Sequence, residues 1–304
     1  MGGEAVGAME LPVVVGVDGS EGNPQAVDWA VAAAERAGLP LRLVHASLWE
    51  HYEGVRPRLG GDRPLEQVCA ENLVSTAEDR AHRLAADMRV STEVWPEDPV
   101  TALLREGHEA SLLVLGPRGH GSIVGLLLGS ASLAVAARAH CPVVVARGAE
   151  PNRRATYRRV VVGVGDSAGS AAAARFAFRE ARSRGCELVA VRAWHRTVHL
   201  SKPSASAGAD PAGDGRQRAD AWVDRVLGAV REEYPEVALR RKVVRGTAHR
   251  TLLDEAATAD LLVVGARRRG AVGLQLGRVN HAVLRRASCP VAIVPEQGRV
   301  IRAE

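Results

Sequence analysis

Short apolar runs alternate along this chain with longer segments that place apolar residues at helical spacing. Residues 11–17 (LPVVVGV) and 41–46 (LRLVHA) are apolar and rich in valine and leucine, without the alternation of a half-exposed strand. Such runs are typical of strands that are covered on both faces. The chain therefore opens with a β-α-β unit, for which a parallel sheet is the expected arrangement.

The segment between these two strands has the signals of an amphipathic helix. Four apolar residues recur at the spacing of one helical face: Val27, Ala30, Val31 and Ala34. We expect Asn23 as the N-cap, Pro24 at the first helical position and Gly38 as the terminator.

The same alternation continues to about residue 148. A helical segment (65–88) and a strand (89–95) come next, followed by a helix (99–110) and a strand (112–116). A glycine-rich loop (116–129), a helix from about Ser130 and a last strand (142–146) complete the unit. This order predicts a five-stranded, doubly wound parallel sheet with helices on both faces.

The second half of the chain repeats the first. VVVGV at 13–17 recurs at 160–164, CPVVVA at 141–146 recurs as CPVAIV at 289–294, and SLLVLGPRG is matched by DLLVVGARR, with offsets of 147 to 149 residues. We therefore predict two tandem Rossmann-like α/β domains, 1–148 and 157–304, joined through a polar stretch around Pro151. The second copy carries an insertion rich in Ser, Ala, Gly and Pro at 201–215, which we expect to stay mobile.

In doubly wound sheets, ligands bind past the carboxyl ends of the strands where the strand order reverses. The residues that follow the fourth strand form a glycine run with the spacing G-x2-G-x9-G-S, which includes Gly116, Gly119, Gly121 and Gly129. Glycines let successive backbone N–H groups turn toward an anion, and the helix that Ser130 and Ser132 open favours negative charge at its start. A flexible strand-to-helix connection is the alternative interpretation of the glycines.

Asp18 follows the first strand and is expected to face the same crevice. A carboxylate there can accept hydrogen bonds from a ribose hydroxyl, so the run, the helix start and the acid together predict a nucleotide site. Arg118 and His120 can add donors to phosphate; either can equally be a solvated residue at the tip of the loop.

The second copy departs from this pattern. Gly165 stands where the first copy has Asp18, the acid having moved to Asp166, and Arg268 matches Gly119. The run to Gly277 is one residue shorter, and Arg278 replaces Ser130. The arginines at 267–269 can neutralise phosphate or fill the pocket, but charge alone does not rebuild a backbone cradle. We expect the second site to be degenerate.

Composition narrows the function classes. The net charge of +5 comes from arginines spread along the chain, with only 5 Trp, 3 Tyr and 2 Phe to stack on bases. This favours a modestly basic surface over a nucleic-acid-binding one. No apolar run is long enough to span a bilayer, and no secretory signal is visible. The four cysteines form no CxxC pair, and Cys141 and Cys289 are expected to be buried structural thiols. The expected location is the cytoplasm.

Catalytic signatures are missing from the sequence. It contains no GxxxxGK[ST] phosphate loop, no HRD and DFG pair, no GxGxxG after a first strand and no HExxH pair. Slow or incidental ATP hydrolysis is the most that we expect.

The chain resembles the universal stress protein family, and specifically its tandem-domain members. The motifs that carry the resemblance are VVVGVDGS at 13–20, the glycine run at 116–130 and HCPVVVAR at 140–147, and it covers nearly the whole chain. It implies ATP, with or without Mg²⁺, as the ligand. It places Gly16, Asp18 and Ala46 on the adenosine side, and implies that Gly116, Gly119, Gly129, Ser130 and Ser132 hold the phosphates. The residues beside them are included as candidates for the same site: Arg118, His120, Gly121, Ser122 and Ala131.

The resemblance also implies that the terminal strands of the two copies pair across the domains as an internal pseudo-dimer; association of two chains as a homodimer is left open. The expected function is a cytoplasmic, ATP-binding stress-response protein that signals by conformation or by choice of partner. The alternatives are a nucleotide-independent scaffold and a weak ATPase.

Overall fold

The computed structural model describes residues 10–48, 65–117, 128–167, 169–194, 211–266 and 276–296. The first half contains nine helices and strands among these residues: β1 (Val13–Gly16), α1 (Asn23–Ala37), β2 (Leu41–Ala46), α2 (Leu65–Leu84), β3 (Val90–Trp95), α3 (Pro99–Glu106), β4 (Leu112–Leu115), α4 (Ser130–Arg138) and β5 (Val143–Val145). A short 3₁₀ turn, Gly107–Glu109, follows α3.

The second half repeats this order after a short connecting helix, α5 (Glu150–Arg153). Its elements are β6 (Arg159–Gly163), α6 (Gly169–Arg184), β7 (Glu187–Trp194), α7 (Pro211–Glu233), β8 (Leu239–Arg245), α8 (Ala248–Ala256), β9 (Leu261–Gly265), α9 (Arg278–Arg286) and β10 (Val291–Val294). The repeated order confirms the predicted fold class of two Rossmann-like α/β units.

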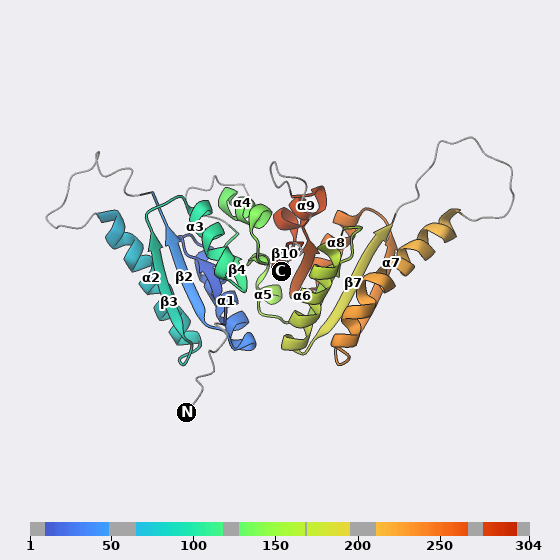
Figure 1. Ribbon diagram of the computed structural model, residues 1–304, viewed down its shortest axis with the longest axis horizontal. Helices are drawn as coiled ribbons and strands as arrows, with labels where there is room; N and C mark the ends of the chain where they lie inside the picture. Colours follow the sequence, from blue (N-terminus) through green and yellow to red (C-terminus); the bar gives the residue numbers. More distant parts are fainter. Residues whose placement is uncertain are drawn as a thin grey trace, which may run out of the picture.

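The strands of both halves form one sheet in the order β3-β2-β1-β4-β5-β10-β9-β6-β7-β8. Neighbouring strands within each half are parallel, whereas β5 and β10 pair antiparallel, with Val144 opposite Ala292. This central pair joins the two halves into an internal pseudo-dimer, as the family resemblance implies. Figure 1 shows the two halves on either side of the centre, with α4 and α9 both near the middle of the view.

Two hydrophobic layers cover the faces of the sheet, and each runs through both halves. Alternate strand residues face opposite layers: Val13 and Val15 belong to the layer that includes α1, α2, α6 and α7, and Val14 belongs to the layer that includes α3, α4, α8 and α9. Strands covered on both faces explain the continuous apolar runs of the sequence. No helix within the described ranges is long and apolar enough to cross a membrane.

The polar connection between the halves is an ordered element. The side chain of Asn152 in α5 is 2 % exposed, and its amide donates to three carbonyls at the end of α8: Ala256 at 3.3 Å, Ala257 at 3.3 Å and Ala259 at 2.8 Å. Arg147 also crosses between the halves, donating to the carbonyl of Leu284 in α9. These buried polar contacts fix the second half against the end of the first.

Two local expectations were wrong. Asn23 is the first residue of α1, and Gly22 takes the N-cap position. The backbone N–H of Asn23 donates to the carbonyl of Ser20, so a tight turn precedes the helix where a side-chain cap was expected. The insertion expected to be mobile ends inside α7, since residues 211–215 are helical; residues 201–210 lie outside the described residues.

Candidate functional site

The crevice that the sheet order creates in the first copy lies between the carboxyl ends of β1 and β4. Strand β1 pairs with β2 on one side and with β4 on the other, so the connections that leave β1 and β4 run to opposite faces of the sheet. Gly16 and Asp18 come from the end of β1, and Gly116 comes from the end of β4. The structure therefore brings these three predicted residues to one switch point.

Gly16 has a packing reason to be glycine. A Cβ built at Gly16 would lie 3.0 Å from the Cδ2 of Leu115 and 3.3 Å from the Cδ2 of Leu103. The equivalent Gly163 of the second copy is held in the same way by Leu252, at 3.1 Å. Close helix-to-strand packing thus accounts for this glycine in both copies, whether or not a ligand binds.

Asp18 is half-buried and organises the turn after β1. Its Oδ1 accepts hydrogen bonds from the backbone N–H of Ser20 at 3.0 Å and from the Ser20 hydroxyl at 2.7 Å. Gly19, between them, has a left-handed φ of 70°. This is an Asx-type turn, which fixes the position of the carboxylate at the mouth of the crevice.

His45 and Ala46 end the neighbouring strand β2. The Nδ1 of His45 lies 2.7 Å from the carbonyl oxygen of Val17, the residue immediately before Asp18, and His45 is 9 % exposed. Ala46 is half-buried at the last position of β2. The ends of β1 and β2 are therefore tied together by a side chain, which fixes the wall of the crevice.

The two ends of the glycine run are hydrogen-bonded to each other. The Ser132 hydroxyl donates to the carbonyl of Gly116 at 2.9 Å, and the N–H of Gly129 donates to the carbonyl of Pro117 at 2.9 Å. Ser132 is 8 % exposed. Its hydroxyl proton therefore closes the loop, a structural use that the sequence did not reveal.

The start of α4 meets the description of an anion site. Gly129 is buried and extended at the N-cap position, Ser130 is exposed, and the first helical bond runs from the N–H of Leu133 to the carbonyl of Gly129 at 3.1 Å. The N–H groups of Ser130, Ala131 and Ser132 precede that bond, where a helix has no intrahelical acceptors to offer. The helix dipole adds partial positive charge at the same place.

Five predicted site residues lie outside the described residues: Arg118, Gly119, His120, Gly121 and Ser122. Their predicted role in holding phosphate therefore stays a prediction. The arginines of the second copy at 267–269 also lie outside.

The matching crevice of the second copy contains its own ion pair. Arg192 in β7 takes the place of His45 and donates to the carbonyl of Val164 at 3.0 Å. Its second guanidinium nitrogen lies 2.5 Å from Oδ1 of Asp166. The Arg192 side chain is 14 % exposed, so a largely buried cation stands at the end of β6 in the second copy.

Two further side chains bond to Gly165, which stands in the place of Asp18. The indole N–H of Trp222 in α7 donates to its carbonyl at 2.8 Å, and the hydroxyl of Ser170 donates to the same carbonyl at 2.9 Å. The N–H of Gly165 in turn donates to Ser170 at 3.1 Å. The backbone polar groups at this position are therefore satisfied from within the protein.

Sequence reasoning missed these substitutions, although the sequence carries the signal. An offset of 147 residues pairs His45 with Arg192, and an offset of 149 pairs Leu73 with Trp222. These two pairs lie in the second strand and in the helix after it, outside the acid and the glycine run that make up the motif. One feature of the run survives in both copies, because Asn280 donates to the carbonyl of Gly265 at 3.0 Å, as Ser132 does to Gly116.

Several other buried polar and titratable groups lie outside this crevice. Within the described ranges there is no group of three or more His, Cys, Asp or Glu side chains that could hold a metal ion. Burial raises the pKa of both the Cys141 and the Cys289 thiols to about 12, as expected for structural thiols. Glu106, 7 % exposed, accepts from Arg42 at 3.0 Å and from the indole of Trp95 at 3.1 Å.

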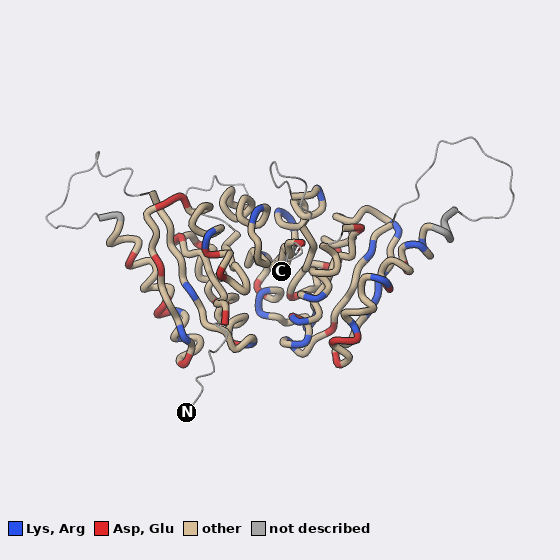
Figure 2. Tube along the Cα trace, viewed as in Figure 1, with Lys and Arg blue, Asp and Glu red and all other residues tan. Residues whose placement is uncertain are grey.

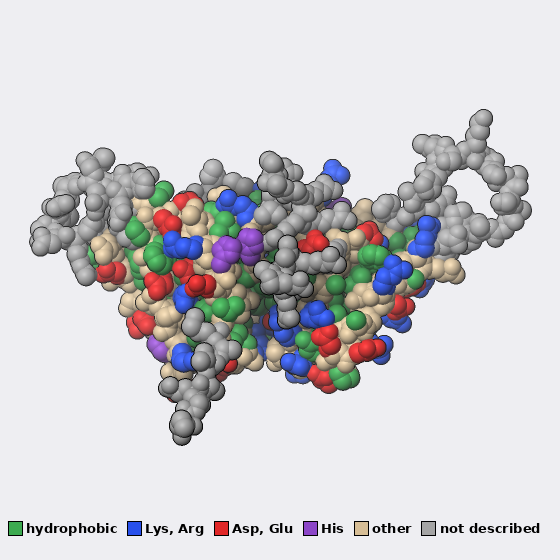
Figure 3. Space-filling model, in the orientation of Figure 1, with side chains coloured by type: hydrophobic (Ala, Val, Ile, Leu, Met, Phe, Trp, Pro, Cys, Tyr) green, Lys and Arg blue, Asp and Glu red, His purple; other side chains and the backbone are tan. Residues whose placement is uncertain are grey.

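Charge on the surface is mixed. Figure 2 shows basic and acidic residues distributed over both halves, and Figure 3 shows both signs interspersed on the face in view. Among the described residues, ion pairs between the two signs recur on the helices, such as Arg175 with Glu233 at 2.6 Å.

Comparison with known proteins gives one consistent result. The model of the universal stress protein family matches residues 10–147 and again 156–295. A universal stress protein of Mycobacterium tuberculosis is 32% identical over 299 residues, covering 93% of this chain and 94% of its own length. A second one from the same organism is 33% identical over 296 residues, covering 95% and 98%.

Solved structures agree on the fold. The crystal structure of a universal stress protein from Archaeoglobus fulgidus superposes with a TM-score of 0.64 at 18% identity, covering 93% of this chain and 98% of that one. The two matches of the family model, the relatives aligned along almost their full lengths and the shared architecture lead to one conclusion. This chain belongs to the universal stress protein family and carries two copies of the family domain in tandem.

Proposed function

We propose that the protein binds one ATP per chain in the crevice of its first copy, and that the bound nucleotide acts as a regulatory ligand in a stress response. The observation that carries the proposal is the contrast between equivalent positions of the two copies. Asp18 and His45 border the crevice in the first copy, whereas Gly165 and the Arg192–Asp166 pair stand there in the second.

The residues present in the first copy fit the ligand. Three backbone N–H groups at the start of α4 lie at the end of the glycine run and suit a phosphate chain. Asp18 has its carboxylate oriented by Ser20 and suits the hydroxyls of a ribose. Ala46 offers small apolar bulk at the end of β2, where an adenine ring needs room. Mg²⁺, if it accompanies the nucleotide, takes its ligands from phosphate and water.

The second copy lacks the elements of this fit. Its backbone at Gly165 is already bonded to Trp222 and Ser170, and a ribose would meet the guanidinium of Arg192 where the first copy has an imidazole. Arg278 replaces the exposed Ser130 at the start of the helix. We therefore expect a stoichiometry of one.

A ligand role suits the site better than turnover. Fast phosphoryl transfer uses a lysine or metal ions on the phosphates and a group that positions water. The described residues of the crevice supply one carboxylate, Asp18, which already holds the Ser20 turn. Any hydrolysis should be far below the typical enzyme median of ~10 s⁻¹.

A nucleotide-independent scaffold is the second candidate, and one observation favours it. The bond that closes the glycine run is kept in the degenerate copy, where Asn280 replaces Ser132. Closure of the loop is therefore useful to the fold without a nucleotide. Under this alternative, both copies serve only as surfaces for partners.

Isothermal titration calorimetry with ATP separates the two candidates. We expect one site per chain, with affinity reduced by Asp18→Ala and unchanged by Asp166→Ala, the matched change in the second copy. Two equal sites would contradict the degenerate second copy. A folded protein that binds no ATP at millimolar concentration would favour the scaffold. In a separate steady-state assay, ATP turnover near the enzyme median that is lost when the glycine run is mutated would reveal a missed catalytic group.

A further inference from the structure

A recess of about 410 Å³ lies between the two halves, away from the nucleotide crevice. Its walls come from α1 and α2 of the first half, from α5 and the two residues after it, and from the end of α6. Five arginines and two acids contribute to its lining: Arg36, Arg80, Arg153, Arg154, Arg184, Asp28 and Glu150. A volume of this size suits a small molecule.

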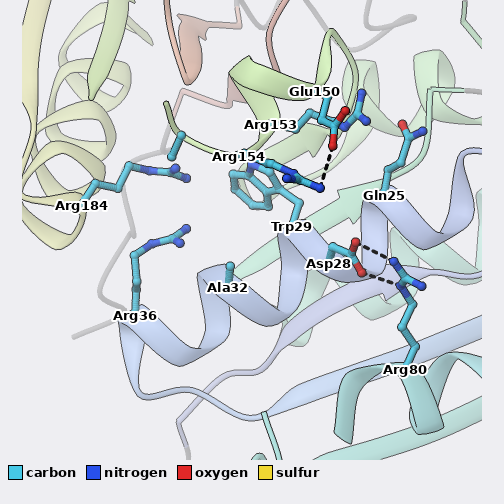
Figure 4. Close-up of a pocket in the computed structure, with 11 residues that line it drawn as sticks. Gln25, Asp28, Trp29, Ala32, Arg36, Arg80, Glu150, Arg153, Arg154 and Arg184 are labelled. Atoms are coloured by element: carbon cyan, nitrogen blue, oxygen red, sulfur yellow. Dashed lines mark hydrogen bonds and ion pairs between the residues drawn. The ribbon is translucent and has the colours of Figure 1, made fainter. Parts of the chain in front are cut away.

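The acids of the recess are already paired. Asp28 holds Arg80 through two hydrogen bonds, at 2.5 Å and 2.7 Å, and Glu150 lies 2.6 Å from Arg154. Figure 4 shows both pairs joined by dashed lines on the right and upper sides of Trp29. The charge left over on the lining is therefore positive.

Three arginines of the lining have no partner among its two acids: Arg36, Arg153 and Arg184. Of these, Arg36 and Arg184 face each other. Figure 4 shows them reaching from the last turns of α1 and α6 toward the same space, with no dashed line from either to an acid that is drawn. Within the described part of the chain, no acid lies within ion-pair distance of Arg36, although Glu35 and Glu180 are near enough to act on its charge. Burial and the charge of Arg184 outweigh them and lower the pKa of Arg36 to about 10.

Arg184 is held in place but not fully satisfied. Its side chain is 6 % exposed, its Nε donates to Glu180 at 3.0 Å, and its guanidinium lies 5.5 Å from the centre of the Trp29 ring. Its buried Nη2 lies 3.0 Å from the same Glu180 oxygen without hydrogen-bond geometry, and so has no acceptor of its own. The contacts with Glu180 and Trp29 thus hold the Arg184 guanidinium in one place at the wall of the recess, and a planar guanidinium is suited to phosphoryl oxygens.

Helix capping does not explain these arginines. The carbonyls at the end of α1 already accept hydrogen bonds from backbone N–H groups, since Gly38 donates to Glu35 at 3.2 Å and Leu39 donates to Ala34 at 3.0 Å. Gly185 closes the end of α6 in the same way, donating to Arg182 at 3.0 Å. Two like charges are thus brought together without a structural task for Arg36.

We propose that this recess binds a small phosphorylated anion with two or more negative charges, at a site separate from the nucleotide crevice. Phosphoryl oxygens match the planar forks of Arg36 and Arg184, and Arg153 on the opposite wall can meet a second phosphoryl group. The recess is also distant from the crevice. The start of α1 follows the Asp18 turn, and Arg36 lies about 20 Å further along α1, at 1.5 Å per residue. The ligand would contact both halves and the linker, and would therefore hold the halves together.

Titration with inorganic pyrophosphate in the presence of saturating ATP tests the proposal on the full chain. We expect binding that raises the melting temperature, and that Arg36→Gln weakens about tenfold or more. Arg36→Gln should also raise the melting temperature of the free protein, because it removes a like-charge contact. A purely structural Arg36 predicts the opposite sign. Arg36→Lys, which keeps the charge and loses the fork, should bind with intermediate affinity.

Arg179→Gln is the matched control, since Arg179 is an exposed arginine of α6 outside this recess. Its substitution should leave both pyrophosphate and ATP binding unchanged, and Arg36→Gln should leave ATP binding unchanged. If ATP displaces pyrophosphate completely, the anion binds at the glycine run and the proposal is overturned. If pyrophosphate binds Arg36→Gln and wild type equally, it responds to general surface charge, which also overturns the proposal. Absence of binding at low ionic strength would do the same. Citrate binding as tightly as pyrophosphate would contradict the phosphoryl preference.

Discussion

The hydroxyl of Ser132 donates to the carbonyl of Gly116, 2.9 Å away, and so joins the two ends of the glycine run. The second copy makes the same closure with an amide, from Asn280 to Gly265. A residue that the sequence motif assigns to phosphate binding is thereby committed to holding the loop, and its backbone N–H is the group left for a ligand.

Ser132→Asn and Ser132→Ala separate these two roles. If the side chain serves loop closure, Ser132→Asn should keep most ATP affinity, because asparagine makes the bond in the second copy. Ser132→Ala should lose about 1 kcal/mol of stability, together with some affinity. Calorimetry and urea unfolding measure both quantities. Equal loss of ATP binding in the two variants, with stability intact, would instead assign the hydroxyl to the phosphates.

Asp18 also has two separable roles, the turn with Ser20 and the proposed contact with ribose. Asp18→Asn keeps an oxygen that can accept from Ser20 and removes the charge, so it should stay as stable as wild type and bind ATP more weakly. Asp18→Ala removes both and should lose about 1.5–3 kcal/mol of binding free energy. If Asp18→Asn binds like wild type, the carboxylate serves the turn alone.

Much of the fold was predictable because it rests on local patterns. Apolar runs covered on both faces predict the strands, and Gly38 ends α1 with a left-handed φ of 67°, as its position in the sequence indicates. The repeat of the motifs predicts the duplication. The cap of α1 was not predictable in the same way, because the turn from Ser20 to Asn23 competes with a side-chain cap and wins.

The parts of the site that depend on tertiary contacts were not predictable. Nothing local in the sequence shows that Ser132 reaches Gly116, or that Arg192 and Trp222 converge on the end of β6. Arg36 and Arg184 are 148 residues apart and meet only because β5 and β10 pair antiparallel and bring α1 beside α6. The polar stretch around Pro151 has the composition of a linker, yet Asn152 within it is buried. Its contacts with the end of α8 are likewise tertiary and leave no local signal in the sequence.

That anchor, Asn152, gives a test of how the halves are joined. Asn152→Ala should lower the free energy of unfolding by about 1–3 kcal/mol, because three carbonyls of the second half, two of them buried, lose their donor. Asn152→Asp should cost more, since a carboxylate would face three carbonyl oxygens. Urea unfolding gives the values. Unchanged stability in Asn152→Asp would show that α5 detaches freely and that the two halves are held by the central strand pair alone.

The buried thiols predict how stability depends on alkaline pH. The pKa of Cys141 and of Cys289 is raised by burial from 9.0 to about 12, so the folded state keeps both protons where the unfolded state has lost them. A raised folded pKa gives stability that is complete below pH 9 and is lost as the pH rises from 9 toward 12. The free energy of unfolding should fall over this range, and the fall should be smaller in the Cys141→Ala, Cys289→Ala double variant. Cys186→Ala, which removes a less deeply buried thiol, is the control and should change the slope less.

Since the thiolate is the reactive form, exposed Cys69 should also react with a thiol reagent at pH 8 well before either buried cysteine. Rapid labelling of Cys141 or Cys289 in the folded protein, with an unchanged alkaline slope in the double variant, would contradict this account of the core.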